Sequence, residues 1–303
     1  MVRFPISGVE CSPFLPPLVS FVIASLVTSA GVSGAFLLLP FQMSVLGYVS
    51  PGVSPTNLIY NIVAIPGGVY RYLHEKRMMW PLAWAVIAGT LPGVFLGALI
   101  RVRYLPDPAA AKVFVGCVLL YLGWRLFRAR PAQGNSSETG SGFTPLGADA
   151  VVKTRVVSVR NIEYEFRGQT YSFRPLAIFT LAAVVGLVGG IYGIGGGAII
   201  APFVVAAMGL PVYTVAGAAL LGTFITSIAG VLCFEWLGTT ALAAGNSVRP
   251  DYLLGALFGV GGLFGTYVGA RNQRYLPERW IRLFLAFLVT GVGLNYVVQF
   301  LLG

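Results

Sequence analysis

The chain has 303 residues, of which 56% are hydrophobic and only 10% are charged. Soluble domains carry about 25% charged residues, so this composition excludes a large soluble domain and indicates a polytopic membrane protein. The net charge is +10, but the Lys and Arg residues lie between apolar segments, where loop charges that set membrane topology explain most of them. We therefore expect the lipid bilayer, and no nucleic acid, among its partners. An anionic substrate is compatible with the positive charge.

Two long uncharged stretches, residues 11–70 and 175–234, dominate the chain. In the first, an apolar segment over 14–39 is interrupted by Gly31-Val-Ser-Gly34, and a second apolar segment follows over 56–69. Further membrane spans are expected from length and hydropathy over residues 78–100, 108–127, 252–270 and 283–303.

Residues 128–174 differ in character and form a linker. Positions 131–147 are rich in Gly, Ser, Pro and Thr, which is typical of a flexible segment. Positions 151–173 alternate polar and apolar residues around the turn signal Arg167-Gly168, so a small β-hairpin is expected there. We expect this cytoplasmic linker to be a tether, with a cap on the membrane part as the alternative.

The segments on either side of the linker, residues 1–127 and 175–303, match as two copies of one transmembrane unit. At a constant offset of 162, Gly31-Val-Ser-Gly34 falls opposite Gly193-Ile-Gly-Gly196. Other matched motifs are Pro40-Phe41 with Pro202-Phe203, the triplet Gly89, Gly93 and Gly97 with the triplet Gly261, Gly265 and Gly269, and Arg103-Tyr-Leu-Pro106 with Arg274-Tyr-Leu-Pro277. Internal repeats of this kind are typical of secondary transporters. The triplets make smooth helix faces, which pack closely either within one chain or in a homodimer.

The second glycine-rich break lies within residues 176–209, which are 34 residues long. As one helix they would measure about 50 Å, against a hydrocarbon core of about 30 Å, so this segment must tilt strongly or break. A break at 191–197 allows a re-entrant hairpin. Four simple crossings per copy would place the basic loops 101–107 and 271–282 outside, against the positive-inside rule. A hairpin plus three crossings per copy places the loops 71–77 and 271–282 and the linker inside. Only the 101–107 loop then violates the rule.

We therefore expect an all-α polytopic membrane protein made of two homologous, inverted repeats. Each repeat consists of a glycine-broken re-entrant helix pair plus three transmembrane helices. We expect the protein to span the inner or plasma membrane of the cell. This arrangement predicts that both termini lie on the outer side of that membrane.

The stretch Gly189-Gly-Ile-Tyr-Gly-Ile-Gly-Gly-Gly-Ala-Ile-Ile-Ala-Pro202 resembles the sulfite exporter TauE/SafE family of membrane permeases. The segment from Val215 to Thr226 supports this resemblance, which covers nearly the whole chain outside the linker. The resemblance implies movement of sulfur-containing anions, namely sulfite or organosulfonates such as sulfoacetate. The first copy departs from the fuller glycine pattern, with Ser33 where the second has Gly195.

The candidate anion site combines the two breaks with polar residues of the segments that follow them. In the hairpin arrangement the second half-helices begin near Gly34 and Gly197, and we expect their ends to meet near the membrane midplane and to bind the anion with alternating access. Helix N-termini offer unpaired N–H groups and a partial positive charge, which suit an oxyanion. Polar side chains at membrane depth tend to face the interior of the bundle. The candidate residues are Gly31, Ser33, Gly34, Asn57, Asn61, Tyr192, Gly193, Gly195, Gly196, Gly197, Thr223 and Thr226. The alternatives are tight packing for the glycines, hydrogen bonding between helices for the Asn and Thr residues, and aromatic packing for Tyr192.

No acidic residue lies at the centre of an apolar span, which disfavours a proton or cation carrier and favours an anion. The spans also lack a carboxylate pair, a His–Cys cluster and metal-ligand spacing, so neither an enzyme nor a cofactor is expected. The expected function is a secondary transporter, an exporter, of small sulfur-containing anions. Two alternatives stay open: an anion channel, and a permease for another small anion such as a carboxylate, sulfate or thiosulfate.

Overall fold

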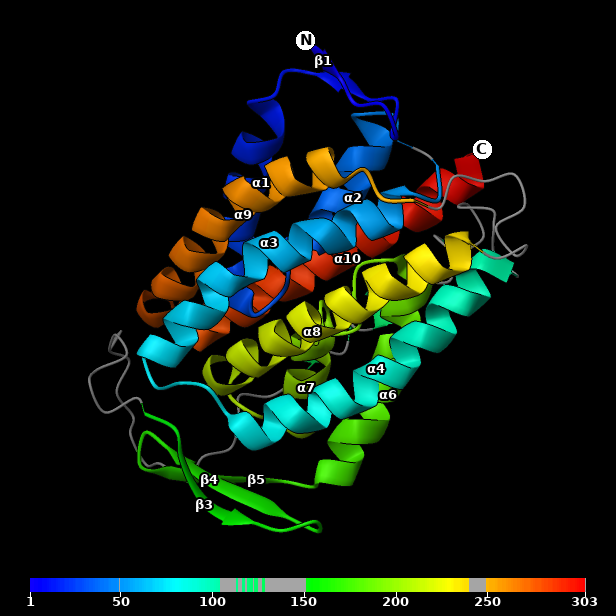
Figure 1. Cartoon of the computed structure of the whole chain (residues 1–303). Helices are drawn as coiled ribbons and strands as arrows, with labels where there is room; N and C mark the ends of the chain where they lie inside the picture. Colours follow the sequence, from blue (N-terminus) through cyan, green and yellow to red (C-terminus); the bar gives the residue numbers. More distant parts are fainter. Residues whose placement is uncertain are drawn as a thin grey trace.

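The computed structural model describes residues 1–48, 50–103, 151–239 and 249–302, together with scattered positions between 113 and 128. The predicted span 108–127 lies largely outside these described residues, and the predicted flexible segment 131–147 lies wholly outside them. Helices packed side by side make up most of the molecule, with a small sheet at one end (Figure 1).

The helical elements are α1 (Leu15–Val27), η1 (Thr28–Ala30), α2 (Ala35–Ser44), α3 (Val53–His74), α4 (Trp80–Arg103), α6 (Pro175–Tyr192), α7 (Ile200–Met208), α8 (Val212–Gly238), α9 (Tyr252–Asn272), η3 (Gln273–Tyr275) and α10 (Glu278–Leu302). The strands are β1 (Val2–Arg3), β2 (Glu10–Cys11), β3 (Lys153–Val157), β4 (Ile162–Phe166) and β5 (Gln169–Phe173).

Within the described residues, five helices are long and apolar enough to cross a membrane. They correspond to α4, α6, α8, α9 and α10, while α1 with η1, and α2, are apolar but shorter. Helix α3 carries Asn57 and Asn61 and is not among the five. A mostly helical fold with several candidate spans is therefore confirmed.

The two glycine triplets lie at very close helix contacts. The triplet of α4 meets α6 so tightly that added Cβ atoms would collide with carbonyl oxygens, and the colliding pairs are Gly89 with Phe179, Gly93 with Ala183 and Gly97 with Leu187. The triplet of α9 meets α1 in the same way, through Gly261 with Pro17, Gly265 with Phe21 and Gly269 with Ser25. Small residues allow helix backbones to approach this closely. Both glycine faces are covered by helices of the same chain, so a homodimer would need a different surface.

The connections α3–α4 and η3–α10 and the start of α8 gather around the sheet, at what we call the sheet end (Figure 1). The backbone N–H of Val152, just before β3, donates to the Lys76 carbonyl at 3.2 Å. The Tyr213 hydroxyl at the start of α8 donates to the Leu276 carbonyl at 2.6 Å. Both chain termini lie at the opposite end of the bundle (Figure 1).

At that opposite end, the buried Asp251 ties three segments together. It caps α9 by accepting a hydrogen bond from the Leu254 N–H at 3.1 Å, as Asp residues commonly do at helix N-termini. It also accepts from the Ser7 hydroxyl at 2.8 Å, which anchors the β1–β2 hairpin. Its own N–H donates to the Thr56 hydroxyl of α3 at 2.8 Å.

The β-hairpin expected over residues 151–173 is part of a larger element, because residues 153–173 form a three-stranded antiparallel sheet in the order β3-β4-β5, so the fold is mostly but not wholly helical. Strands β4 and β5 are joined by the two-residue turn Arg167-Gly168, whose φ angles of 53° and 71° are both positive. Such turns match the natural twist of paired strands, which explains why this sequence forms a hairpin.

The sheet is docked on the helices rather than tethered beside them. On β4 the alternation of residues buries Ile162, Tyr164 and Phe166 on one face. The Tyr164 hydroxyl lies 3.0 Å from the Thr214 hydroxyl of α8, and the Phe166 ring lies 6.4 Å from the Tyr213 ring. The free energy gained by burying these three large side chains favours the docked sheet over a free tether.

Candidate functional site

Two buried non-helical breaks, at residues 31–34 and 193–199, lie beside each other. Gly31, Gly193 and Gly195 have φ angles of 74°, 81° and 87°, in the left-handed region that side chains rarely adopt. These positions require glycine for backbone conformation, independently of any packing.

The helix boundaries differ slightly from the sequence expectation. Helix α6 ends at Gly193, which caps it in the left-handed conformation. Helix α2 begins at Ala35 directly after Gly34, near the expected start. Helix α7 begins only at Ile200, later than the expected start near Gly197, because residues 196–199 form turns.

Asn61 is fully buried and connects both breaks to α8. Its amide nitrogen donates to the Ile194 carbonyl at 2.9 Å and to the Ser227 hydroxyl at 3.1 Å. Its amide oxygen accepts from the Ser33 hydroxyl at 2.5 Å. The breaks also meet directly, since the Ser33 N–H donates to the Ala198 carbonyl at 3.3 Å. A single uncharged side chain therefore holds three segments of the centre.

Asn57 lies one turn away from Asn61, and its side chain is hydrogen-bonded to α2. Its amide nitrogen donates to the Ala35 carbonyl at 2.9 Å, and its amide oxygen accepts from Gln42 at 3.5 Å. These contacts fix α2 against α3, as expected of hydrogen bonds between neighbouring helices.

Thr223 and Thr226 are buried, but their hydroxyls bond within α8. The Thr223 hydroxyl donates to the Ala219 carbonyl at 2.8 Å, and the Thr226 hydroxyl donates to the Gly222 carbonyl at 2.8 Å. Such back-bonding satisfies a hydroxyl at little cost to the helix. Thr223 lies against Gly197 of the second break, but the hydroxyls of both residues bond to backbone carbonyls of α8.

The remaining glycines of the breaks are places where other groups approach the backbone. A Cβ added there would collide with Tyr60 at Gly34, with Ser54 at Gly193, with Val94 and Thr90 at Gly196, and with Thr223 at Gly197. Gly195 differs, because its Cβ would lie 3.0 Å from the Ser227 hydroxyl and 3.4 Å from the Asn61 amide nitrogen. Gly195 is thus the break glycine that lies against Asn61 and Ser227.

All twelve candidate residues are buried, so this conformation of the centre is closed. Three buried hydroxyls beside the breaks, those of Ser54, Tyr60 and Tyr192, have no hydrogen-bond partner among the described residues. A buried hydroxyl without a partner costs about 1–3 kcal/mol. The ring of Tyr192 packs edge-on against Tyr296 at 5.7 Å, which leaves its hydroxyl free to donate.

Sequence reasoning missed Ser54, Tyr60 and Ser227. The spacing of Ser54, Asn57 and Asn61 at i, i+3 and i+7 places them on one face of α3, and Ser227 follows Thr223 by four residues. The same helical-face rule that selected Asn57 and Asn61 would have found Ser54 and Ser227.

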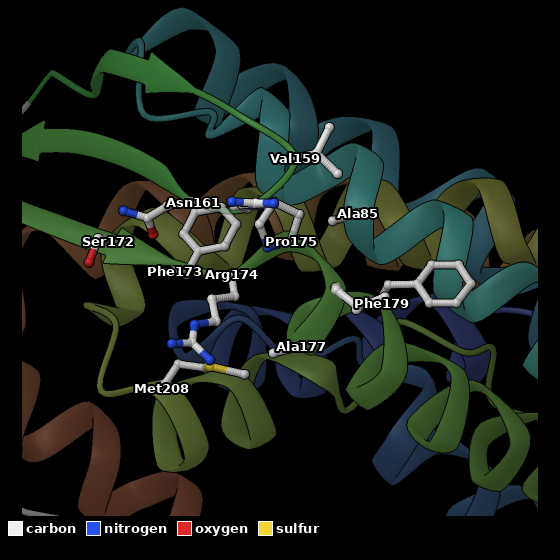
Figure 2. Close-up of a pocket in the computed structure, with 12 residues that line it drawn as sticks. Ala85, Val159, Asn161, Ser172, Phe173, Arg174, Pro175, Ala177, Phe179 and Met208 are labelled. Carbon is white, nitrogen blue, oxygen red and sulfur yellow. The ribbon is translucent and has the colours of Figure 1, made fainter.

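The structure also has a cavity of about 1080 Å³ at the sheet end, between the sheet and the start of α6 (Figure 2). Its lining includes Arg160, Asn161, Arg174 and Phe179, and none of the twelve candidate residues. It is therefore separate from the closed centre.

The fold and its centre define a multi-span membrane protein whose buried candidate residues are uncharged amides, hydroxyls and glycines. The chain belongs to the sulfite exporter TauE/SafE family, whose family model matches residues 17–296. The resemblance seen in the glycine-rich stretch is thereby confirmed, together with the membrane location, and members of this family are transporters rather than enzymes. No match to the chain was found among curated proteins or among solved structures.

Proposed function

We propose that this protein is a secondary transporter that exports small sulfur-containing anions, such as sulfite or organosulfonates of the sulfoacetate kind. Family membership supports export of sulfite or a related sulfur anion. The observation that carries the site is the bonding of Asn61 to both glycine breaks at once. Amide and hydroxyl donors can solvate an anion at membrane depth without a buried cation, which would be costly there.

The donors at the centre are partly engaged and partly free. Asn61 donates to the Ile194 carbonyl, whereas the hydroxyls of Ser54, Tyr60 and Tyr192 have no partner among the described residues. An arriving anion would accept from such free donors and would compete with the Ile194 carbonyl for the amide. Binding would then loosen the contact between the two breaks, which is the coupling that alternating access requires.

We further propose that the two copies are inverted repeats with re-entrant hairpins. Gly31 contacts Ala216 of α8, and Gly193 contacts Ser54 of α3. The two contacts are equivalent in the repeat, because Gly193 follows Gly31 by 162 residues and Ala216 follows Ser54 by the same 162 residues. Each copy therefore presses its break against the long helix of the other.

Helix directions support the inversion. Helix α3 runs toward the sheet end and α8 runs away from it, while α4 runs away from it and α9 runs toward it (Figure 1). Helices α6 and α7 both have an end at the sheet end, where Pro175 and Met208 line one cavity. The start of α1 and the end of α2 lie at the opposite end (Figure 1).

Charge supports a cytoplasmic sheet end. Residues 71–77, 151–174 and 271–282 contain twelve basic and four acidic side chains. At the opposite end the charges of the described residues are nearly balanced, with Arg3, Arg101, Arg103 and Arg249 against Glu10, Glu235 and Asp251. Because Lys and Arg favour cytoplasmic loops, we place the sheet end inside.

The test is transport by purified protein in proteoliposomes, with sulfite, sulfoacetate, thiosulfate, sulfate and simple carboxylates as substrates. We expect saturable movement of sulfite or a sulfonate, and competition among the sulfur anions. A rate that never saturates would indicate a channel, and a preference for carboxylates would indicate a permease of another class.

A further inference from the structure

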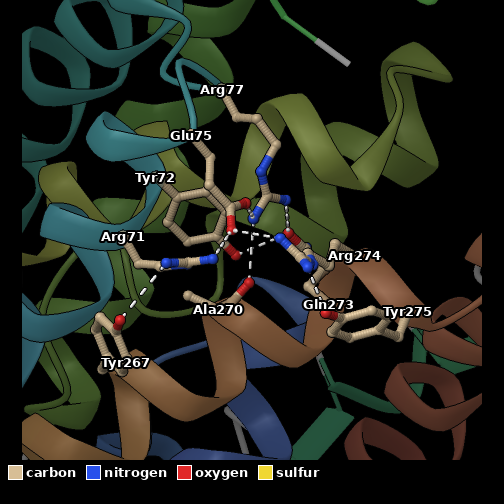
Figure 3. A network of polar contacts seen from close by, with 9 residues as sticks. All are labelled: Arg71, Tyr72, Glu75, Arg77, Tyr267, Ala270, Gln273, Arg274 and Tyr275. Carbon is tan, nitrogen blue, oxygen red and sulfur yellow. Dashed lines mark hydrogen bonds and ion pairs between the residues drawn. The ribbon is translucent and has the colours of Figure 1, made fainter. Parts of the chain in front are cut away.

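Three arginines and one glutamate form a cluster at the sheet end, where the α3–α4 connection meets α9 and η3 (Figure 3). Arg71 and Arg77 bind the two oxygens of the Glu75 carboxylate at 2.6 and 2.5 Å. Arg274 of η3 lies 3.9 Å from the same carboxylate. Three positive charges thus face a single negative charge.

Arg77 is held from several directions. Its side chain is only 2% exposed, and its guanidinium donates to Gln273 at 2.7 Å and to the Ala270 carbonyl at 3.1 Å. The same group lies over the Tyr72 ring, 4.7 Å from its centre. A buried guanidinium fixed in this way is pre-organised to bind an oxyanion, because its planar fork matches pairs of oxygen acceptors.

The cluster has donors that its own residues do not satisfy. The Nε atoms of Arg71 and Arg77 and the Nε2 atom of Gln273 are buried and have no hydrogen-bond partner among the described residues. Unsatisfied buried donors are unfavourable, more so when they are charged. An oxyanion would supply both the missing acceptors and the missing negative charge.

The cluster can be reached from the sheet end. The side chains of Arg274 and Arg71 are 36% and 14% exposed, so an arriving anion meets these two arginines before Arg77. Arg71 and Asn61 lie on the same helix, ten residues apart, which corresponds to about 15 Å. The cluster therefore stands on the helix that leads to the central site.

We propose that Arg71, Arg77 and Arg274 form an oxyanion-binding site at the sheet end, in which the Glu75 carboxylate is an internal anion that an external oxyanion replaces. The site deepens the transport proposal, on which it rests for the identity of the natural ligand as a sulfur oxyanion. It acts as a first binding position, from which the anion moves along α3 to the centre. Neutralising Glu75 removes the internal competitor and strengthens binding of the external anion.

The experiment measures sulfate binding to the purified full-length protein in detergent by titration calorimetry. Sulfate is the probe because it is a stable oxyanion. Glu75→Gln should lower the Kd for sulfate at least tenfold, and adding Arg274→Gln should abolish that gain, while Arg274→Lys should keep part of it. Glu165→Gln is the matched control, because it removes one carboxylate from an arginine pair at the same end, on the sheet. It should leave the affinity within about twofold.

An unchanged affinity in a folded Glu75→Gln protein would overturn the site, as would an equal gain in Glu165→Gln. If Glu75→Gln does not fold, Arg274→Gln alone decides, since this partly exposed residue should weaken sulfate binding severalfold. Nanodiscs with and without phosphatidylglycerol separate the two sources of such an anion. Tighter binding to phosphatidylglycerol with no response to free sulfate would overturn the free-anion site.

The outcome is independent of the transport test. Sulfate binding by Glu75→Gln would stand even if no sulfur anion were transported. Sulfite transport by the wild type, together with no gain in Glu75→Gln, would overturn this site alone.

Discussion

The amide nitrogen of Asn61 lies 2.9 Å from the carbonyl oxygen of Ile194, and this hydrogen bond joins positions 133 residues apart. It links a long helix of the first half to the glycine break of the second half. Because the bond is fully buried, either half can move relative to the other only if the bond breaks or another group replaces it. This is the contact at which we expect substrate binding and movement to be coupled.

Replacing Asn61 with Leu should raise the KM for the transported anion at least tenfold. The change removes two donor interactions and one acceptor interaction, and each buried hydrogen bond contributes about 1 kcal/mol or more. Ser227→Ala should have a smaller effect, because it removes one partner of Asn61 and keeps the bond to Ile194. Transport assays in proteoliposomes measure both.

Thr223→Val is the matched control for these variants. Within the described residues the Thr223 hydroxyl donates to the Ala219 carbonyl of its own helix, so its loss should change KM by less than threefold. Equal effects of Thr223→Val and Asn61→Leu would assign both residues to general packing.

Gly196→Ala should destabilise the protein by about 1–3 kcal/mol, because the new Cβ would lie 2.6 Å from Val94 and 2.9 Å from Thr90. The structure thus makes Gly196 a packing position, so larger substitutions there would confound binding with folding. Gly238→Ala is the control, since no atom of the described residues lies within 4 Å of its Cβ position. Thermal unfolding should show a lower Tm for Gly196→Ala only, and equal Tm values would contradict the close contact with α4.

The sequence alone predicted the breaks and Asn61 but not the way in which they meet. Closely spaced glycines allow the left-handed backbone at which a helix can end, and an Asn in an apolar segment is costly enough to stand out. The partner of Asn61 is a backbone carbonyl at Ile194, and no pattern in side chains reveals which carbonyl a break will expose. Thr223 was a candidate because it is also a polar residue in an apolar segment, yet its hydroxyl donates to the Ala219 carbonyl of its own helix.

The docked sheet shows a second limit of sequence reasoning. Alternation and the Arg167-Gly168 turn indicated a hairpin, because both signals are local. Whether the apolar face of such a hairpin stays near solvent or packs on helices depends on residues distant in the chain, such as Thr214. Local periodicity carries no information about that partner.

Gly93→Ala and Gly265→Ala should each lower the Tm without changing the oligomeric state. Both residues contact a helix of the same chain, and a Cβ at Gly265 would lie 2.6 Å from the Phe21 carbonyl oxygen. Light scattering after size-exclusion chromatography gives the mass. Gly291→Ala is the control, because none of the described parts of the chain comes within 4 Å of its Cβ position. A variant that dissociates a dimer while keeping its Tm would show that these glycines face a second copy instead.

A reporter fused after Gly303 should read as outside the cell membrane. Helix α10 runs from the basic sheet end to the opposite end, where both termini lie (Figure 1), and the excess of basic residues places the sheet end inside. A second reporter inserted into the turn between Arg167 and Gly168 should read as cytoplasmic, because this turn joins β4 and β5 on the sheet. Alkaline phosphatase is active only outside and a fluorescent protein folds reliably inside, so the two fusions give opposite signals. If both sites read as cytoplasmic, helix α10 does not cross the membrane, and if the signals are exchanged, the basic sheet end faces outward against the charge rule.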